Sequence, residues 1–412
     1  MLAAVVVVAA CLPWGGTHAQ VEMRLDRVDS YIPRFAGKKA MNRAYRPELS
    51  RLQAEMQDRM AAGENLSCSA QIYDEAHWLV NFTDRKTDVE QRIAGLRESL
   101  KEKDQAFATR QDPRDGSFGP CHQSWIWRFD SSVDPLKELA KQGKRPPVPL
   151  KIWEPVDTPE KITALMRSLL ISETAGGHNK RKELNKAITA LGQLLWLDDT
   201  EAVFPGHLDR DALAGALTRF VDEEWQVPET GYWGAWYRDG ETVYKTNDLS
   251  LTFHIISYRN GDVRHHDRIA RTTFGIRNVE YPYGWDTGGT QNNHHAYDVA
   301  RIINLVWDEL DATSRARANA SLYLMTARSI VLSVNDDGVF DPRPYTSVAE
   351  AYYFGVSFLS EVGLFGNPMP VLSGIKVIDA QPLLAQINAN LATLHPLDPW
   401  VAATRRKLEA LR

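Results

Sequence analysis

The chain has 412 residues, and its 48 Lys and Arg against 53 Asp and Glu give a formal net charge of −5. A protein with no excess of cations does not track a phosphate backbone, so we exclude a polybasic nucleic-acid binder. The 43% hydrophobic and 25% charged fractions are those of an ordinary globular protein, which excludes wholesale disorder.

The N-terminus begins with an apolar run at 2–12, which leads into small residues that end at Ala19. The run is too short to span a bilayer, and its small-residue exit is typical of signal-peptidase cleavage after Ala19. No Lys or Arg precedes the run, so a buried apolar N-terminus is the alternative. We therefore expect a signal peptide at 1–19 and a periplasmic or secreted protein without a membrane span.

Removal of such a peptide would leave two cysteines, Cys68 and Cys121. An even pair in an oxidising compartment favours a single disulfide, and two buried thiols are the alternative. Two cysteines so far apart in the chain do not make a zinc site.

Helical periodicity recurs along most of the chain, whereas strand patterns are few and short. A turn at 111–119 and a Pro- and Lys-rich linker or long loop at 134–154 come before the main helical region. We therefore expect an N-terminal helical part at 20–150 and a catalytic region at 151–412. The predicted helices cover 47–62, 86–107, 159–172, 180–197, 210–224, 297–310, 314–334, 347–362 and 381–394.

One type of turn, built from Asp or Thr, Gly and an aromatic residue, recurs after helices at 115–118, 230–234 and 336–340. A helix pair closed by such a turn and repeated builds an α/α toroid, whose loops collect around one cavity. The fold class that we expect is mainly α, an incomplete (α/α) toroid barrel of helix hairpins with a central cleft and few short strands.

Aromatic side chains gather in the Gly-rich stretch 231–237, which includes Trp233, Trp236 and Tyr237. Aromatic rings stack on sugar faces, so we expect these three side chains to form a substrate-binding platform. The alternative is a hydrophobic plug at the end of the barrel.

A helix is expected after Asp248, which occupies a good N-cap position. His254 and Tyr258 lie one helical turn apart in it and share one face, with Arg259 next in the chain. We expect these three side chains to bind substrate, and His254 and Tyr258 could form an acid–base pair. A structural core histidine is the alternative.

The strongest signal is 281–298, in which a Gly-rich loop delivers polar side chains to the start of an amphipathic helix. Backbone amides at a helix N-terminus favour an anionic group, and the Asn292 and Asn293 side chains can donate hydrogen bonds to a carboxylate. His294 is the side chain best suited to move a proton near neutral pH. Trp285, Asn292 and Tyr297 are expected to contact the substrate.

These groups meet the demands of β-elimination in a uronate polymer. Donors such as Asn or Arg neutralise the sugar carboxylate, a base removes the weakly acidic C5 proton, and an acid, commonly Tyr, protonates the leaving O4. The reaction requires no metal and no cofactor. The pairs His265-His266 and His294-His295 do not indicate a metal site, because adjacent side chains diverge.

Two segments resemble the α/α-toroid alginate lyases. Asn292-Asn293-His294 followed by Tyr297 resembles their Asn-Asn-His-x-Tyr motif. The acidic–Gly–aromatic–Pro turn at 334–342, followed by Arg343 and then Ala351-Tyr352, resembles a later segment of the same enzymes.

The resemblance implies a role for each matched residue. Asn293 would neutralise the uronate carboxylate and His294 would be the base. Tyr352 would be the catalytic acid, with Arg343 in support. The spacing departs from the family pattern, so Tyr345 and Tyr353 compete with Tyr352 for the tyrosine role.

The leading hypothesis is therefore a secreted lyase whose partner is an acidic polysaccharide, with no nucleic-acid partner. One alternative is a glycoside hydrolase on the same toroid, which would use paired carboxylates drawn from Glu229, Asp248, Asp286 and Asp298. Another is a non-catalytic glycan-binding protein. The sequence names neither the polymer, nor endo or exo action, nor the oligomeric state.

Overall fold

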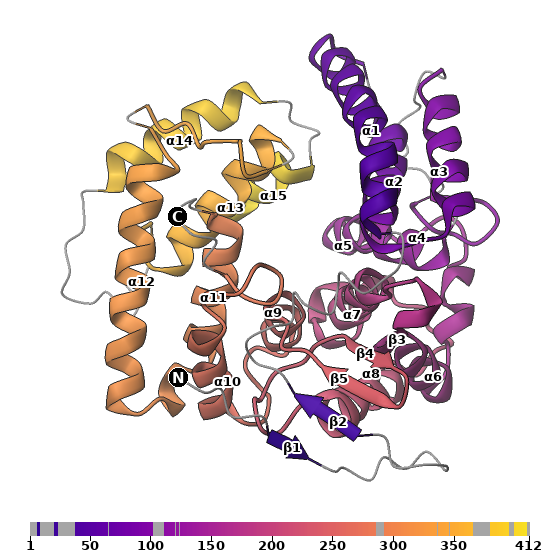
Figure 1. Ribbon diagram of the computed structural model, residues 1–412. Coiled ribbons are helices and arrows are strands. Elements are labelled where there is room, and N and C mark those ends of the chain that lie inside the picture. Colours follow the sequence, from indigo (N-terminus) through magenta and orange to yellow (C-terminus); the bar gives the residue numbers. More distant parts are fainter. Residues whose placement is uncertain are drawn as a thin grey trace. The chain divides into compact units, whose positions relative to one another are not determined.

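The computed structural model describes residues 6–8, 20–23, 38–64, 66–101, 111–119, 121–122, 124–285, 292–335, 337–345, 347–365, 380–394 and 399–409. These residues are mainly helical, as the sequence predicted (Figure 1). No helix among them is both long and apolar enough to cross a membrane. Most of the predicted signal peptide, residues 1–5 and 9–19, lies outside the described residues.

The chain divides into two compact units. Unit 1 comprises Met1–Gln226 and Trp233–Thr246, and unit 2 comprises Val227–Tyr232 and Asn247–Arg412. The sequence placed a boundary at residue 150, which falls inside unit 1.

Unit 1 holds eight α-helices in the described residues, in which α1 packs on α2, α2 on α3, α4 on α7, and α6 on α7 and α8. Their apolar positions recur at helical spacing, as in α7, where Leu184, Ile188, Leu191 and Leu195 are buried. The helices are α1 Lys38–Ala61, α2 Ser67–Phe82, α3 Lys86–Ser99, α4 Trp125–Ser131, α5 Val133–Lys141, α6 Pro159–Leu170, α7 Arg181–Trp196 and α8 Arg210–Arg219.

A small sheet completes unit 1, with the strand order β1-β2-β5-β4-β3. Strands β4 and β5 form an antiparallel hairpin in which Tyr237 pairs with Tyr244, and β3 lies parallel to β4. The strands are β1 Val6–Val8, β2 Gln20–Met23, β3 Ile171–Glu173, β4 Trp236–Asp239 and β5 Thr242–Lys245.

The prediction of a linker or long loop at 134–154 is wrong. This segment contains most of α5, which buries Val133 and Leu136, and the start of a 3-10 helix at Lys151–Val156, which buries Ile152 and Trp153. These two short apolar faces are difficult to recognise in a sequence rich in Pro and Lys, because each element contributes only two or three buried side chains.

A disulfide joins Cys68 in α2 to Cys121, with 5.3 Å between the two Cα atoms. It connects the start of α2 to the turn that precedes α4. The two cysteines are therefore bonded, as the oxidising-compartment argument favoured.

Unit 2 is helical, and α11 packs against both α9 and α13, which in turn packs against α15. Side-chain caps begin four of its helices, from Asp248, Asn292, Asp311 and Ser347. The helices are α9 Leu249–Tyr258, α10 His266–Gly275, α11 Asn293–Leu305, α12 Ala312–Leu332, α13 Val348–Glu361, α14 Ala380–Thr393 and α15 Pro399–Glu409.

The recurring Gly turns share a backbone conformation. Gly116, Gly231 and Gly338 have φ angles of +75°, +71° and +78°, in the left-handed region that favours glycine. A Cβ atom at Gly231 would also lie 2.8 Å from Ile269, and one at Gly338 would lie 2.7 Å from Gln386. The similarity of these turns is therefore conformational, and the missing side chain allows α10 to approach Gly231 and α14 to approach Gly338.

Candidate functional site

The N-terminus of α11 presents the Asn-Asn-His residues. The Asn292 side-chain oxygen accepts a hydrogen bond from the backbone N–H of His294 at 3.0 Å, which fixes the first turn of the helix. This cap turns the carbonyl oxygen of the Asn292 amide toward the helix.

Asn293 is fully buried, and its amide links α11 to α12. Its Nδ2 donates to Ser333 Oγ at 3.0 Å, and its Oδ1 accepts from Ser329 Oγ at 2.7 Å. A side chain held in this way does not face a substrate, so the structure does not support the predicted contact of Asn293 with a sugar carboxylate.

His294 belongs to a network with Tyr281 and Asp298. The His294 Nε2 atom lies 3.1 Å from the Tyr281 hydroxyl and 3.8 Å from Asp298 Oδ2, and the Tyr281 hydroxyl donates to that same Oδ2 at 3.2 Å. The side chain of Asp298 is 1% exposed, whereas that of His294 is 32% exposed. The network therefore runs from a buried carboxylate to a partly accessible imidazole.

The direction of the hydrogen bonds in this network follows from how strongly each group accepts a hydrogen bond. A carboxylate is the strongest acceptor of the three groups, so the tyrosine hydroxyl donates to Asp298 and the His294 Nε2–H donates to the tyrosine oxygen. In this tautomer the lone pair of the neutral ring is on Nδ1. That nitrogen is the one able to accept a proton.

Phe354 and Tyr345 complete the surroundings of His294. The Phe354 ring stacks on His294 with 4.0 Å between ring centroids and on Tyr345 with 6.1 Å. The Tyr345 hydroxyl accepts the backbone N–H of Asn293 at 2.8 Å. Burial raises the pKa of Tyr345, so its hydroxyl keeps a proton to donate.

Tyr352, predicted as the catalytic acid, lies elsewhere. Its ring is 2% exposed, its hydroxyl donates to the backbone oxygen of Gly338 at 3.1 Å, and burial raises its pKa. Positions 352 and 354 of a helix point about 200° apart, and it is Phe354 that contacts His294. The structure therefore brings Tyr345, and not Tyr352, beside the histidine.

Arg343 lies two residues before Tyr345 in the same loop. Its Nε donates to both oxygens of Asp341, at 2.9 and 2.8 Å, and its side chain is 85% exposed. The guanidinium group lowers the pKa of Asp341. Arg343 is therefore paired with Asp341, and the structure does not support its predicted role beside Tyr352.

The predicted substrate-binding residues of α9 do pair with each other. His254 Nδ1 lies 3.0 Å from the Tyr258 hydroxyl, and both side chains are half-buried. Arg259 lies 3.6 Å from Asp262. These contacts agree equally with an acid–base pair and with the structural alternative.

Trp285 and Tyr297 are mostly enclosed. The Trp285 indole donates to the backbone oxygen of Thr273 at 2.7 Å, and only 6% of this residue is exposed. Tyr297 meets Phe253 edge-on at 5.2 Å, and burial raises its pKa. Both rings therefore pack within unit 2 rather than offering a face to a sugar.

The predicted aromatic platform is wrong, because its rings belong to the core of unit 1. Trp233 donates to the backbone oxygen of Val221 at 2.9 Å, and Tyr237 donates to Asn179 at 3.2 Å. Lys245 Nζ lies 4.1 Å from the ring centroid of Trp236. All three residues are at most 2% exposed, which fits the alternative of apolar packing.

The carboxylates considered for a hydrolase have separate surroundings. Asp248 is buried and caps α9, Asp298 joins the histidine network, and Glu229 is exposed in a turn. Asp286 lies outside the described residues.

His295, next to the network, stacks face to face on Tyr281 with 4.0 Å between ring centroids. Burial lowers the pKa of His295 to about 4. Its neutral ring holds Tyr281 against His294. Across the described part of the chain, no group of three or more His, Cys, Asp or Glu residues could hold a metal ion.

Comparison with models of known families, with curated proteins and with solved structures found no match for this chain. Sequence reasoning gave no role to Tyr281 and considered Asp298 only for hydrolysis. The spacing of Asp298 four residues after His294 could have identified their contact. Tyr281 lies in a loop, where helical or strand periodicity makes no prediction, so the sequence pattern did not indicate its contact with His294.

Proposed function

We propose that unit 2 carries the catalytic centre of a lyase that cleaves a uronate-containing polysaccharide by β-elimination. The observation that supports this most is the chain of contacts from Asp298 through Tyr281 to His294, with Tyr345 at the same helix N-terminus. These contacts bring an imidazole base, His294, near a neutral tyrosine hydroxyl that can act as an acid, Tyr345.

In this proposal His294 is the base and Tyr345 is the acid. Nδ1 of His294 takes the C5 proton, and the electrons of that C–H bond form the C4–C5 double bond. The C4–O4 bond breaks as O4 receives the Tyr345 hydroxyl proton. Transfer of a proton from the imidazolium to the phenolate, directly or through water, restores both groups.

Asp298 and Tyr281 act as positioning residues. They hold the Nε2–H of His294, fix the tautomer, and stabilise the positive charge that develops on the ring. Because Asp298 is buried, its charge is poorly screened by water and its effect on the ring is correspondingly strong.

The sugar carboxylate needs donors other than Asn293. With the Asn292 oxygen committed to the helix cap, the amide nitrogen of that residue is directed away from the first turn and can donate. The partial positive charge of the α11 N-terminus adds to it, and Arg343 lies in the loop that supplies Tyr345. Asn292 thus takes the role first assigned to its neighbour.

The α/α toroid and a periplasmic or secreted location remain parts of this proposal. The Cys68–Cys121 disulfide supports an oxidising compartment, where such bonds persist.

The proposal is tested by mixing the full chain with alginate, polygalacturonate, hyaluronan and glucuronan and following near-ultraviolet absorbance. Elimination leaves a C4–C5 double bond conjugated to the carboxylate, so absorbance should rise with one of the polymers. New reducing ends without absorbance would indicate hydrolysis and contradict the proposal. Binding without any cleavage would favour a glycan-binding protein.

A further inference from the structure

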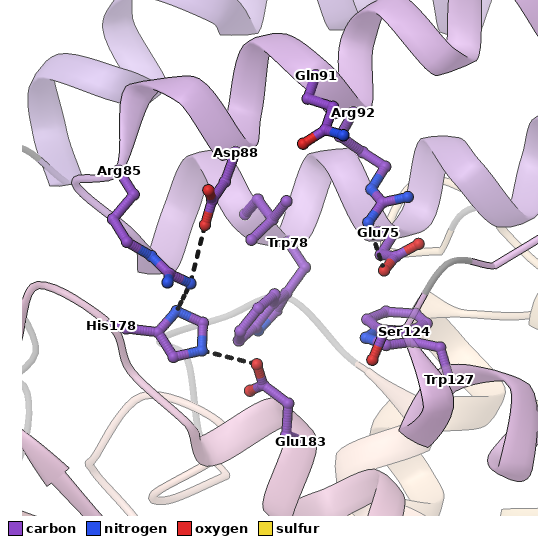
Figure 2. A pocket seen from close by; sticks show the side chains of 11 residues that line it. Glu75, Trp78, Arg85, Asp88, Gln91, Arg92, Ser124, Trp127, His178 and Glu183 are labelled. Atoms are coloured by element: carbon purple, nitrogen blue, oxygen red, sulfur yellow. Dashed lines mark hydrogen bonds and ion pairs between the residues drawn. The ribbon is translucent and has the colours of Figure 1, made fainter.

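The charged side chains around the pocket of unit 1 pair with one another (Figure 2). Arg85 lies 2.9 Å from Asp88 and 3.3 Å from the Nδ1 atom of His178. The other ring nitrogen of His178 lies 2.8 Å from Glu183. These contacts join the start of α3 to the start of α7, so the fold of unit 1 accounts for them.

In unit 2, α15 packs on α13 and brings two further side chains to its rings (Figure 1). Trp400 and Lys407 lie seven residues apart, on the same side of α15. The Trp400 ring lies 4.8 Å from that of Tyr353 between centroids, and Lys407 Nζ lies 5.0 Å from the same ring. The side chains that form the apolar seam of α15 are buried at helical spacing: Val401, Thr404 and Leu408.

Trp400 also contacts Phe354, the ring that meets both groups of the proposed acid–base pair. The Trp400 and Phe354 centroids are 5.6 Å apart. Phe354 is 7% exposed, and its ring is inclined by only 19° to His294 and by 15° to Tyr345. The base and the acid of the proposed mechanism therefore share one aromatic neighbour, which Trp400 contacts in turn.

The hydrogen bonds of His294 do not fix its ring completely. Its Nε2 atom is held by the Tyr281 hydroxyl at 3.1 Å, but a ring held at one edge can still tilt. The face-to-face contact with Phe354, at 4.0 Å, restricts that tilt. Phe354 has no polar atom, so it is only as well fixed as the side chains that pack on it.

We infer that Trp400 is a positioning residue for the elimination reaction. By packing on Phe354 it keeps the His294 imidazole and the Tyr345 hydroxyl oriented toward the C5 proton and O4 of the same substrate. Trp400 acts through Phe354 and not on the reacting atoms. The inference rests on the proposed function, because it concerns the base and the acid named there.

Lys407 provides a matched comparison on the same side of α15. Its Nζ atom packs on the rings of Tyr297, at 5.1 Å, and Tyr353 rather than on Phe354. Burial lowers the pKa of Lys407 to about 8, so its enclosed charge is unfavourable and a neutral side chain of similar length should be tolerated. Lys407→Met therefore alters the packing of α15 without touching the ring beside His294.

The test is the steady-state kinetics of Trp400→Leu in the full chain, with the polymer that the parent cleaves. The kcat should fall by about tenfold or more, because a small displacement of catalytic groups is costly in rate. The KM should change by less than about twofold, because no proposed substrate-binding group is altered. Trp400→Phe keeps a ring and should recover most of the kcat, and Lys407→Met should keep the parental kcat.

A spectroscopic measurement needs no substrate. In the full chain with ¹⁵N-labelled histidine, the His294 ring of the parent should show one tautomer, protonated on Nε2. Its signals are assigned by their absence in His294→Ala. Trp400→Leu should lose this single tautomer, because a ring that tilts away from Tyr281 exchanges between both forms, and Trp400→Phe should keep it.

Thermal unfolding shows whether each variant is folded, and Trp400→Met takes the place of Trp400→Leu if the latter is not. The inference is overturned if the folded variant keeps the parental kcat or the single tautomer. It is also overturned if Lys407→Met loses as much activity, since that would indicate attachment of α15 alone. A parent that cleaves no polymer would contradict the proposed function and this inference with it, whereas an active parent with an equally active Trp400→Leu would contradict only the inference.

Discussion

The reactivity of His294 depends on a residue that it reaches mainly through another. Asp298 lies 3.8 Å from the imidazole, and the Tyr281 hydroxyl contacts both groups more closely. Burial of the Asp298 carboxylate without a hydrogen-bond donor would destabilise the fold. The Tyr281 hydroxyl is that donor, and it leaves the His294 ring partly accessible. In the proposed mechanism the same three contacts therefore serve both stability and proton transfer.

His295 should give unit 2 a measurable dependence on pH. Its pKa is about 4 in the folded chain against an ordinary value of 6.5, so the unfolded chain binds more protons between these values. Stability should therefore fall as pH decreases from 6.5 to 4, by at most about 3 kcal/mol. Denaturant unfolding at several pH values would measure this loss.

The variant His295→Leu should lose this part of the pH dependence. A change at the exposed His207, such as His207→Leu, is the control and should keep the parental slope. An unchanged slope in His295→Leu would show that the ring is not the source.

At the level of elements, α11 joins its neighbours by polar and apolar contacts of different kinds. The Asn293 amide bonds to Ser329 and Ser333 of α12, whereas His294 stacks on Phe354 of α13. Consecutive residues on a helix point about 100° apart, so one motif serves two different neighbours. Asn293 is thus structural, whereas the proposed mechanism gives Asn292 and His294 a functional role.

Asn293→Ala should lower the free energy of unfolding by about 1–3 kcal/mol, because the buried serine hydroxyls lose their partner. Cleavage by the folded variant should be nearly unchanged. Asn292→Ala is the matched comparison: it should cost about 1 kcal/mol through loss of the cap and should also reduce turnover. Loss of cleavage in Asn293→Ala with full stability would restore the role that the sequence assigned to Asn293.

Helix prediction succeeded where one face is apolar and failed where the element is short. The predicted helix at 347–362 corresponds to α13, Val348–Glu361, but its sequence did not show which face meets α11. Tyr352 and Phe354 point in opposite directions and are both buried, so the periodicity carries no orientation. Tyr352 was preferred over Tyr345 because Ala351-Tyr352 resembles the lyase segment, and the periodicity gave no orientation that would have opposed this choice.

At the scale of the whole chain, the limits of sequence reasoning lie in long-range contacts. The division into units places Trp233–Thr246 with the N-terminal half and Val227–Tyr232 with the C-terminal half. No change in composition marks these crossings. The aromatic run 231–237 was taken for a surface because its Gly content indicates a loop, yet its rings are buried, and the Trp233 indole donates to the backbone oxygen of Val221 inside the core.

The most direct test compares two tyrosines as phenylalanine variants, with near-ultraviolet product formation from the cleaved polymer as the readout. Tyr345→Phe should lower the rate about 100-fold or more, the usual contribution of a general acid, and His294→Ala should do the same. Tyr352→Phe should retain activity, because its hydroxyl bonds to Gly338 away from His294. Activity that persists in Tyr345→Phe and disappears in Tyr352→Phe would contradict the account.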